Sequence, residues 1–237
     1  MNTIQDEFIA TVSHELRTPL TSIRGFSQTL LNSWDKIDDD NKKKFIKIIE
    51  EQSNRLIHLV ENVLSVSKMN AGSEVLKKVD VNKLIKDILP MFSEQYKAKA
   101  FVQNLNTNLP PARLDEDKFQ QVLTNLIDNA AKYSAPEKAV TITTELAENF
   151  IVVKITDEGV GIKKEDYDKV FKKFSRLENH LTSTTQGNGL GLYITKELVE
   201  KMGGKISFTS EFGKGTTFKV LIPIYNQEEV LQCSRKS

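Results

Sequence analysis

The sequence contains a single cysteine, Cys233, so it can build neither a disulfide framework nor a metal site with several cysteine ligands. It also lacks an apolar run of the roughly 18 to 20 residues that a membrane span needs, and its first residues do not resemble a secretion signal. The 33 Lys and Arg balance 32 Asp and Glu to a formal net charge of +1, which argues against nucleic acid as a partner. With only 6 Pro and 11 Gly among 237 residues, the composition is typical of a folded protein of about two domains.

The first 70 residues predict two long antiparallel helices. The first runs from residue 3 to about 32, a Ser- and Asp-rich turn at 33–41 ends it, and the second stops near Asn70-Ala71-Gly72. Their apolar stripes are too long to be covered by each other alone, so we expect two copies to pair as a homodimeric four-helix bundle; the alternative is a monomeric hairpin packed on the rest of the chain. The stripes consist of Phe8, Val12, Leu16, Leu20, Ile23 and Leu30, and of Phe45, Ile48, Ile49, Leu56, Leu59, Val60, Val63 and Leu64.

His14 is the unusual residue of the first helix, within the segment SHELRTPL at 13–20. At about 100° per residue, the apolar stripe lies roughly opposite His14, so the imidazole is predicted to face water. Thr18 shares this outward face, and Glu15 flanks the histidine along the chain. An exposed neutral imidazole beside a carboxylate is a competent nucleophile at neutral pH. Pro19, which follows about one turn later, is expected to bend or loosen the helix.

The remaining residues alternate helix and strand. A helix is predicted from about residue 82 to 100, kinked by Pro90, and further helical patterns lie at 115–133, 190–203 and, shorter and basic, at 164–173. This order predicts an α+β layer in which helices cover one face of a mixed sheet. Five strands are expected, at 101–106, 139–146, 150–156, 205–210 and 216–222.

Two motifs in this second part predict contacts with a nucleotide. Asn125, Asn129 and Lys132 are spaced four and then three residues apart, on a helix face separate from the core stripe. Two carboxamide oxygens and an ammonium can hold Mg²⁺ and the phosphates that accompany it. Asp157 opens the sequence DEGVGI at a strand end, where its carboxylate can accept a hydrogen bond from a base amino group while the glycines admit a flat ligand.

A third motif, GNGLGL at 187–192, precedes a helix and offers backbone N–H groups to an anion. The polar and basic segment 171–186 suits a mobile lid over phosphates, with Arg176 as the charge partner. Each feature also has an ordinary interpretation: a solvated helix face, a simple turn, a solvated loop. For His58 and His180 we adopt that interpretation and regard them as surface histidines.

Taken together, these residues resemble the sensor histidine kinases of two-component signalling, over residues 4 to 224 and in the family's order of motifs: histidine box, asparagine box, first glycine box, phenylalanine box, second glycine box. The resemblance implies an all-α dimerisation and histidine-phosphotransfer domain at 1–71, a linker at 72–79, a catalytic ATP-binding domain at 80–225 and a flexible tail at 226–237. The second domain would have the α/β sandwich fold shared with gyrase, the Hsp90 chaperone and the MutL repair protein. The resemblance also implies that this chain lies in the cytoplasm. The full-length protein would be attached to a membrane through a sensor region that is missing here.

By this likeness, His14 would take the γ-phosphoryl group of ATP and pass it to an aspartate on a response-regulator receiver domain, within one chain or across the dimer. Glu15 would orient or deprotonate the imidazole, and Thr18 matches the position used by members that also dephosphorylate their partner. The remaining assignments are Asn129 with Asn125 for Mg²⁺, Lys132 and Arg176 for phosphate, Tyr133 at the border of the nucleotide, Asp157 for the adenine amino group, and Gly159, Gly161, Ile162, Gly187, Gly189, Leu190 and Gly191 for the shape of the pocket and the lid hinges.

The sequence departs from the family pattern at Glu158, where Asn is more usual, at Ser175, where an aromatic is frequent, and at Pro90, within a helix that is usually unbroken. These departures affect local geometry and no residue assigned to chemistry. There are two rival classes of protein. The exposed His14 argues against a purely nucleotide-driven clamp, and the retained motifs argue against a noncatalytic dimeric scaffold. Because Met1 lies only thirteen residues before His14 and no sensor segment is present, we expect a piece of a longer protein.

Overall fold

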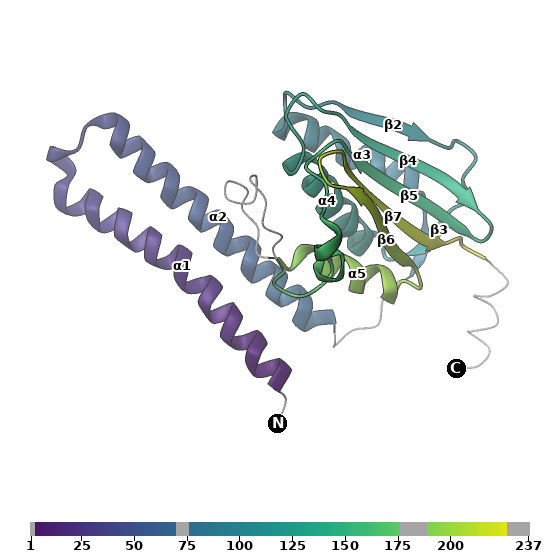
Figure 1. The fold of residues 1–237 in the computed structure, drawn as a ribbon, viewed down its shortest axis with the longest axis horizontal. Coiled ribbons are helices and arrows are strands. Elements are labelled where there is room, and N and C mark those ends of the chain that lie inside the picture. The colour runs from purple at the N-terminus through teal and green to yellow at the C-terminus, as the bar shows by residue number, and fades with distance from the viewer. Residues whose placement is uncertain (1–2, 70–75, 176–188, 227–237) are drawn as a thin grey trace.

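The computed structural model describes residues 3–69, 76–175 and 189–226. A long helical hairpin, α1 and α2, extends away from an α/β part in which a sheet is covered by helices (Figure 1). Residues 176–188, which include Arg176, His180 and Gly187 and all but the first five residues of the lid predicted at 171–186, lie outside the described residues, as do half of the predicted linker and most of the predicted tail. None of the described helices is long and apolar enough to cross a membrane.

The hairpin consists of α1 (Thr3–Ser33), a 3-10 turn η1 (Trp34–Lys36) and α2 (Asp39–Met69). Asp38 begins α2, since its carboxylate accepts a hydrogen bond of 2.9 Å from the backbone N–H of Asn41. The rings of Phe26 and Phe45, 5.1 Å apart, hold the two helices together near the turn. The helix α1 continues through Pro19 to Ser33, so the expected loosening does not end it.

The α/β part contains two sheets. A small antiparallel pair joins β1 (Lys77–Val79) to β3 (Ala112–Leu114), and a five-stranded sheet has the order β2-β4-β5-β7-β6. Only the β2–β4 pair is parallel among these five, so the sheet is mixed, as predicted. The strands of this sheet are β2 (Phe101–Leu105), β4 (Val140–Ala147), β5 (Phe150–Asp157), β6 (Lys205–Glu211) and β7 (Gly215–Pro223), which confirms all five predicted strands within one or two residues.

The helices α3 (Val81–Gln95), α4 (Glu116–Lys132) and α5 (Gly191–Lys201) lie on one face of the sheet (Figure 1). Three predictions about local structure need correction. Pro90 does not interrupt α3, and the segment predicted as a short helix at 164–173 forms only the 3-10 turn η2 (Lys164–Lys169). Residues 77–79, assigned to the linker, pair with β3.

A single apolar core connects the sheet, its helices and the base of the hairpin. The predicted core stripe of α4 is fully buried, and β5 and β7 contribute Ile151, Val153 and Val220 from the sheet. Leu59 of α2, 1% exposed, belongs to the same cluster, and Val63 and Val66 pack against it. The hairpin is therefore seated on the α/β part through apolar contacts, which positions α2 beside α5. The buried residues of α4 are Phe119, Val122, Leu123, Leu126, Ile127, Ala130 and Ala131.

Candidate functional site

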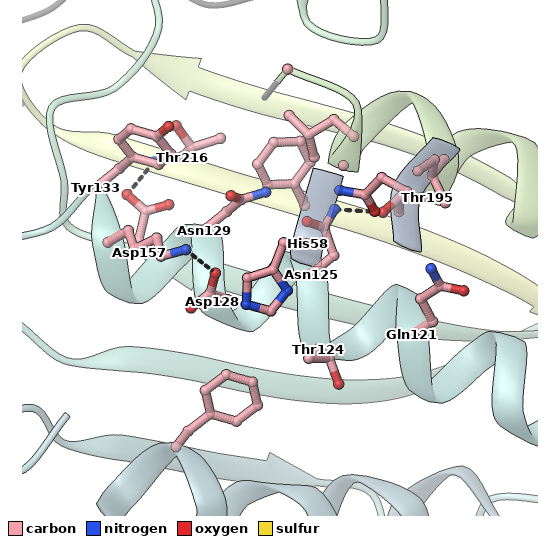
Figure 2. A pocket seen from close by; sticks show the side chains of 18 of the residues that line it. His58, Gln121, Thr124, Asn125, Asp128, Asn129, Tyr133, Asp157, Thr195 and Thr216 are labelled. Carbon is pink, nitrogen blue, oxygen red and sulfur yellow. Dashed lines mark hydrogen bonds and ion pairs between the residues drawn. The ribbon is translucent and has the colours of Figure 1, made fainter. Parts of the chain in front are cut away.

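A cavity of about 960 Å³ lies between α2 and the α/β part. The exposed side of α4 forms its floor, the end of β5 and the start of α5 line two of its sides, and polar residues of α2 face it from the hairpin. Figure 2 shows side chains from these separate elements converging on the same space. A cavity of this size holds a ligand as large as a nucleotide.

The predicted polar stripe of α4 lines this cavity. Asn125 donates a hydrogen bond of 2.7 Å from Nδ2 to Oγ1 of Thr195 on α5, which leaves its Oδ1 as an acceptor. Asn129 lies one turn further along α4, and the ammonium of Lys132 pairs with Asp128 at 2.5 Å. Two carboxamide oxygens in a row fit the oxygen ligands that Mg²⁺ prefers. No group of three His, Cys, Asp or Glu that would hold a metal occurs among the described residues.

Asp157 stands at the end of β5 and lines the cavity with only 6% of its surface exposed. Its Oδ1 accepts hydrogen bonds from the backbone N–H groups of Gly159 (2.9 Å) and Thr216 (3.2 Å), and Oδ2 is left as an acceptor for a ligand (Figure 2). Burial raises the pKa of Asp157 to about 6, against the opposing effect of those two N–H groups and of the charge of Lys99. An anionic acceptor in an apolar recess suits the amino group of a base.

The turn after Asp157 packs directly on the end of α4. Gly159 pairs with Ser134, and the N–H of Val160 donates to the carbonyl of Tyr133 at 3.1 Å. A side chain at position 159 would meet that carbonyl oxygen at 2.2 Å, so this position requires glycine. Gly161 and Ile162 continue the turn along the cavity, which therefore has the wall predicted from the DEGVGI motif.

The second glycine motif is described from Gly189 onward. Gly189 and Gly191 line the cavity, whereas Leu190 is completely buried and supports the start of α5 from the core. A Cβ at position 191 would lie 2.4 Å from Oδ1 of Asn125, so glycine allows α5 to approach α4 closely. The other two predicted residues of this side, Arg176 and Gly187, lie outside the described residues.

His14 is exposed on α1, as predicted, and does not line the cavity. Thr18 is also exposed, and its hydroxyl donates to the backbone carbonyl of His14 at 3.4 Å. Glu15 forms an ion pair with Arg55 of α2, with 3.2 Å between its Oε2 and Nη2 of Arg55. Apart from Gly159 and Leu190, the structure thus brings together around the cavity those predicted nucleotide residues that it describes, and it places the predicted acceptor group apart from them.

The polar face of α2 was missed in the sequence. Arg55 and His58 line the cavity, and Figure 2 shows His58 among the side chains of α4. His58 is a surface histidine, as predicted, with 75% of its side chain exposed, and it also lines the cavity. A signal was present, because Asn54, His58 and Glu61 recur at helical spacing opposite the apolar stripe, but such a pattern is also typical of any solvated face.

Two family models match the chain. One, described as the His Kinase A (phospho-acceptor) domain, matches residues 4–72, and the other, described as the histidine kinase-, DNA gyrase B- and HSP90-like ATPase, matches residues 114–226. The first covers the hairpin that carries His14, and the second covers α4, Asp157 and both glycine motifs. The chain belongs to the sensor histidine kinase family.

This histidine kinase core is similar to two longer sensor proteins, one of Bacillus subtilis and one of Staphylococcus aureus. It is 37% identical over 231 residues to the sensor histidine kinase WalK of Bacillus subtilis, covering 94% of the chain and 37% of WalK. It is 36% identical over 229 residues to the sensor protein SrrB of Staphylococcus aureus, covering 94% of the chain and 39% of SrrB. The chain therefore spans well under half the length of these relatives.

Solved structures of histidine kinases share its fold. The kinase AdeS of Acinetobacter baumannii superimposes with a TM-score of 0.72 at 27% identity, covering 90% of this chain and 98% of AdeS. The kinase ThkA, solved in complex with the response regulator protein TrrA, gives a TM-score of 0.74 at 25% identity, covering 94% of this chain and 63% of ThkA. Full-length ShkA, solved in complex with AMPPNP, gives 0.66 at 26% identity, covering 92% of this chain and 46% of ShkA.

Proposed function

We propose that this kinase core phosphorylates His14 with ATP and passes the phosphoryl group to an aspartate of a response-regulator receiver domain. The observation that carries the proposal is the presence, in one chain, of an exposed histidine beside a carboxylate and of a cavity walled by the asparagine and glycine motifs. We assign residues 1–71 to dimerisation and phosphotransfer and 80–225 to ATP binding, with β1 extending the second unit to residue 77.

ATP binds with its adenine against Asp157, whose Oδ2 accepts a hydrogen bond from the base amino group. The phosphates extend along α4 toward Lys132, which exchanges its ion pair with Asp128 for the phosphate charge. Asn129, with Asn125, would hold the Mg²⁺ that neutralises phosphate charge and fixes the phosphates for in-line transfer. Tyr133 borders the base, and Arg176, which lies outside the described residues, is the further phosphate partner expected from the sequence.

In the transfer step, an imidazole nitrogen of His14 forms a bond to the γ-phosphorus while the bond from that phosphorus to the bridging oxygen breaks and ADP leaves. Glu15 orients the imidazole and takes the proton that its other nitrogen loses. Since His14 does not line the cavity, the two parts of the chain must reorient, within one protomer or across a dimer, before this step. The ion pair between Glu15 and Arg55 must also open, because Glu15 has to contact the imidazole of His14 in this step.

The expected acceptor of the phosphoryl group is a receiver domain, because phosphohistidine is a reactive donor and ThkA, a structural neighbour, was solved with a response regulator. Thr18, exposed one turn after His14, would position a water for a separate phosphatase reaction, in which the water attacks the phosphoryl group on the partner's aspartate and inorganic phosphate leaves. Both activities use the exposed face of α1.

The proposal is tested with γ-labelled ATP and Mg²⁺. Wild type is expected to acquire a label that is labile to acid and stable to alkali, and His14→Gln is expected to acquire none. Because His14 lies outside the cavity, the variant should bind ATP as tightly as wild type, which is the internal control. If wild type acquires no label but binds and hydrolyses ATP, the protein is a nucleotide-driven clamp. If wild type acquires no label and does not bind ATP, it is a noncatalytic scaffold. A label retained by His14→Gln would show that another residue accepts the phosphoryl group.

A homodimer is expected from the apolar residues that the hairpin leaves exposed. Ile57, Val60 and Leu64 recur at helical spacing on α2 and are 55%, 46% and 50% exposed, and α1 adds Ile9 and Leu20 at 55% and 54%. A contiguous stripe of this kind is typical of a four-helix bundle interface.

Val60→Glu should convert the dimer to a monomer, because a buried carboxylate without a partner costs several kcal/mol per copy. Light scattering after size-exclusion chromatography would show a mass near 26.9 kDa in place of twice that value. Lys43→Glu, a change at another exposed position of α2, serves as the control and should stay dimeric. A wild-type mass near 26.9 kDa would instead favour the monomeric hairpin.

A further inference from the structure

Lys99 is a buried lysine that none of the motifs includes. It lies two residues before the start of β2, and only 8% of its surface is exposed. Its ammonium donates to Oγ of Ser134 at 2.8 Å and to the backbone carbonyls of Ala135 at 2.6 Å and Lys138 at 3.2 Å, with the carbonyl of Ser134 at 3.4 Å. All these acceptors belong to one segment, 134–138, between α4 and β4. The ammonium is thus fully satisfied by a single loop.

This loop forms the back of the site that holds Asp157. Ser134 pairs with Gly159 as an isolated bridge, and its hydroxyl donates to the carbonyl of Ala130 at 2.7 Å, which ties the loop to α4. Gly159 in turn donates its N–H to Asp157. A continuous chain of contacts therefore runs from the ammonium of Lys99 through Ser134 and Gly159 to the carboxylate.

The charge of Lys99 acts on the same carboxylate. Burial lowers the pKa of Lys99, and the negative charges of Glu137 and Asp157 oppose that change. Reciprocally, Lys99 lowers the pKa of Asp157, together with the N–H groups of Gly159 and Thr216. The remaining charges on this side, Lys138 and Glu158, are exposed and paired with each other at 3.0 Å.

Burying an ammonium is unfavourable, and a neutral donor would suffice to hold a loop. A cation placed behind a buried carboxylate does more, because it favours the ionised form that accepts a hydrogen bond from a base amino group. We propose that Lys99 is a positioning residue for adenine recognition, holding the 134–138 loop and, through it, the turn that presents Asp157 to the base. This inference rests on the proposed binding of adenine at Asp157.

The test measures the affinity of Lys99→Met for ATP and GTP, from pH 5 to 8, at a temperature where the variant is folded. Its affinity for ATP is expected to fall about tenfold or more, which is the effect of one charge-assisted hydrogen bond. Its preference for ATP over GTP should fall with it, and the loss of ATP affinity at acid pH should begin at a higher pH than in wild type. Lys97→Met, an exposed change two residues earlier, is the matched control and should match wild type in all three respects.

Ser134→Ala separates the two effects of Lys99. It removes the acceptor at 2.8 Å and keeps the ammonium, so its ATP affinity should fall, while the pH at which acid begins to weaken ATP binding should stay that of wild type. This variant also provides the test if Lys99→Met does not fold, because unchanged ATP affinity in folded Ser134→Ala would then overturn the inference. A folded Lys99→Met could instead be less stable and still keep the wild-type affinity for ATP, preference for ATP over GTP and pH dependence of ATP binding. That result would overturn the inference and show that Lys99 only holds the loop. A wild type without ATP affinity would overturn the proposed function itself.

Discussion

Asp157→Asn is expected to weaken ATP binding strongly and, at the same time, to make the protein more stable near pH 8. The amide would present an N–H₂ donor or a weaker acceptor to the base amino group in place of a carboxylate oxygen, so the affinity for ATP should fall on the order of a hundredfold or more. The folded protein gains because it no longer has to bury a charge. The two effects have opposite signs, and a general loss of structure cannot produce both.

The direction of the stability change follows from the pKa of Asp157, which burial raises from 3.8 to about 6. Between those values the folded state keeps a proton that the unfolded state has released, so wild-type stability falls as the pH rises through this window. At about 1.36 kcal/mol for each pKa unit, the free energy of unfolding of wild type is lower by roughly 3 kcal/mol above pH 6 than at acid pH. The asparagine variant does not lose this stability.

Urea unfolding of the nucleotide-free proteins at pH 5 and pH 8 measures this difference. The advantage of Asp157→Asn over wild type should grow between the two pH values. Asp168→Asn, which changes an exposed carboxylate, is the control and should alter neither stability nor ATP affinity. An asparagine variant that binds ATP like wild type would remove Asp157 from base recognition.

Gly159→Ala is expected to cost about tenfold or more in ATP affinity and about 1 to 3 kcal/mol in the free energy of unfolding, as overpacking does. The added Cβ would lie 2.2 Å from the carbonyl oxygen of Tyr133 and 2.7 Å from Oδ1 of Asp157. Neither neighbour can move without disturbing the turn that holds the carboxylate, so the loss should appear in binding as well as in stability.

Nucleotide titration and urea unfolding of Gly159→Ala give both quantities. Gly25→Ala is the control, since a Cβ there meets nothing within 4 Å and should leave ATP affinity unchanged. Its position in the interior of α1 should even stabilise the helix, by about 0.5 to 1 kcal/mol. Equal effects of the two alanine variants on ATP affinity would contradict the close contact at Gly159.

The sequence predicted most of the fold because its periodicities are long and unambiguous. The α4 stripe recurs over four turns, and the five strands of the main sheet carry β-branched or alternating runs. The three-residue strands β1 and β3 were missed, since each is too short to display a period and exists only through pairing with the other. At Pro90, the expectation of an interrupted helix was wrong: the ring occupies an exposed position late in α3, where the missing donor does not end the helix.

The residues of the candidate site that belong to one sequence motif could be predicted, and those that reach the site only through tertiary packing could not. Asn125, Asn129 and Lys132 could be placed on one face of α4 from their spacing alone. Arg55 reaches the cavity only because α2 packs beside α5, and Lys99 contacts residues 35 to 39 positions away. Such contacts depend on tertiary packing, for which a single sequence gives no local signal.

The shared core at the base of the hairpin bears on how often His14 can meet a nucleotide. Leu59 is 1% exposed in the present arrangement, and a reorientation that separates α2 from the α/β part would bring it into water. Exposing one leucine costs about 2 kcal/mol, which lowers the population of a separated arrangement roughly thirtyfold. Salts such as sulfate strengthen apolar association and should slow any transfer that passes through this separation. In the proposed transfer, hydrophobic contact at Leu59 therefore limits the fraction of molecules in which the two parts are apart and His14 can reach a bound nucleotide.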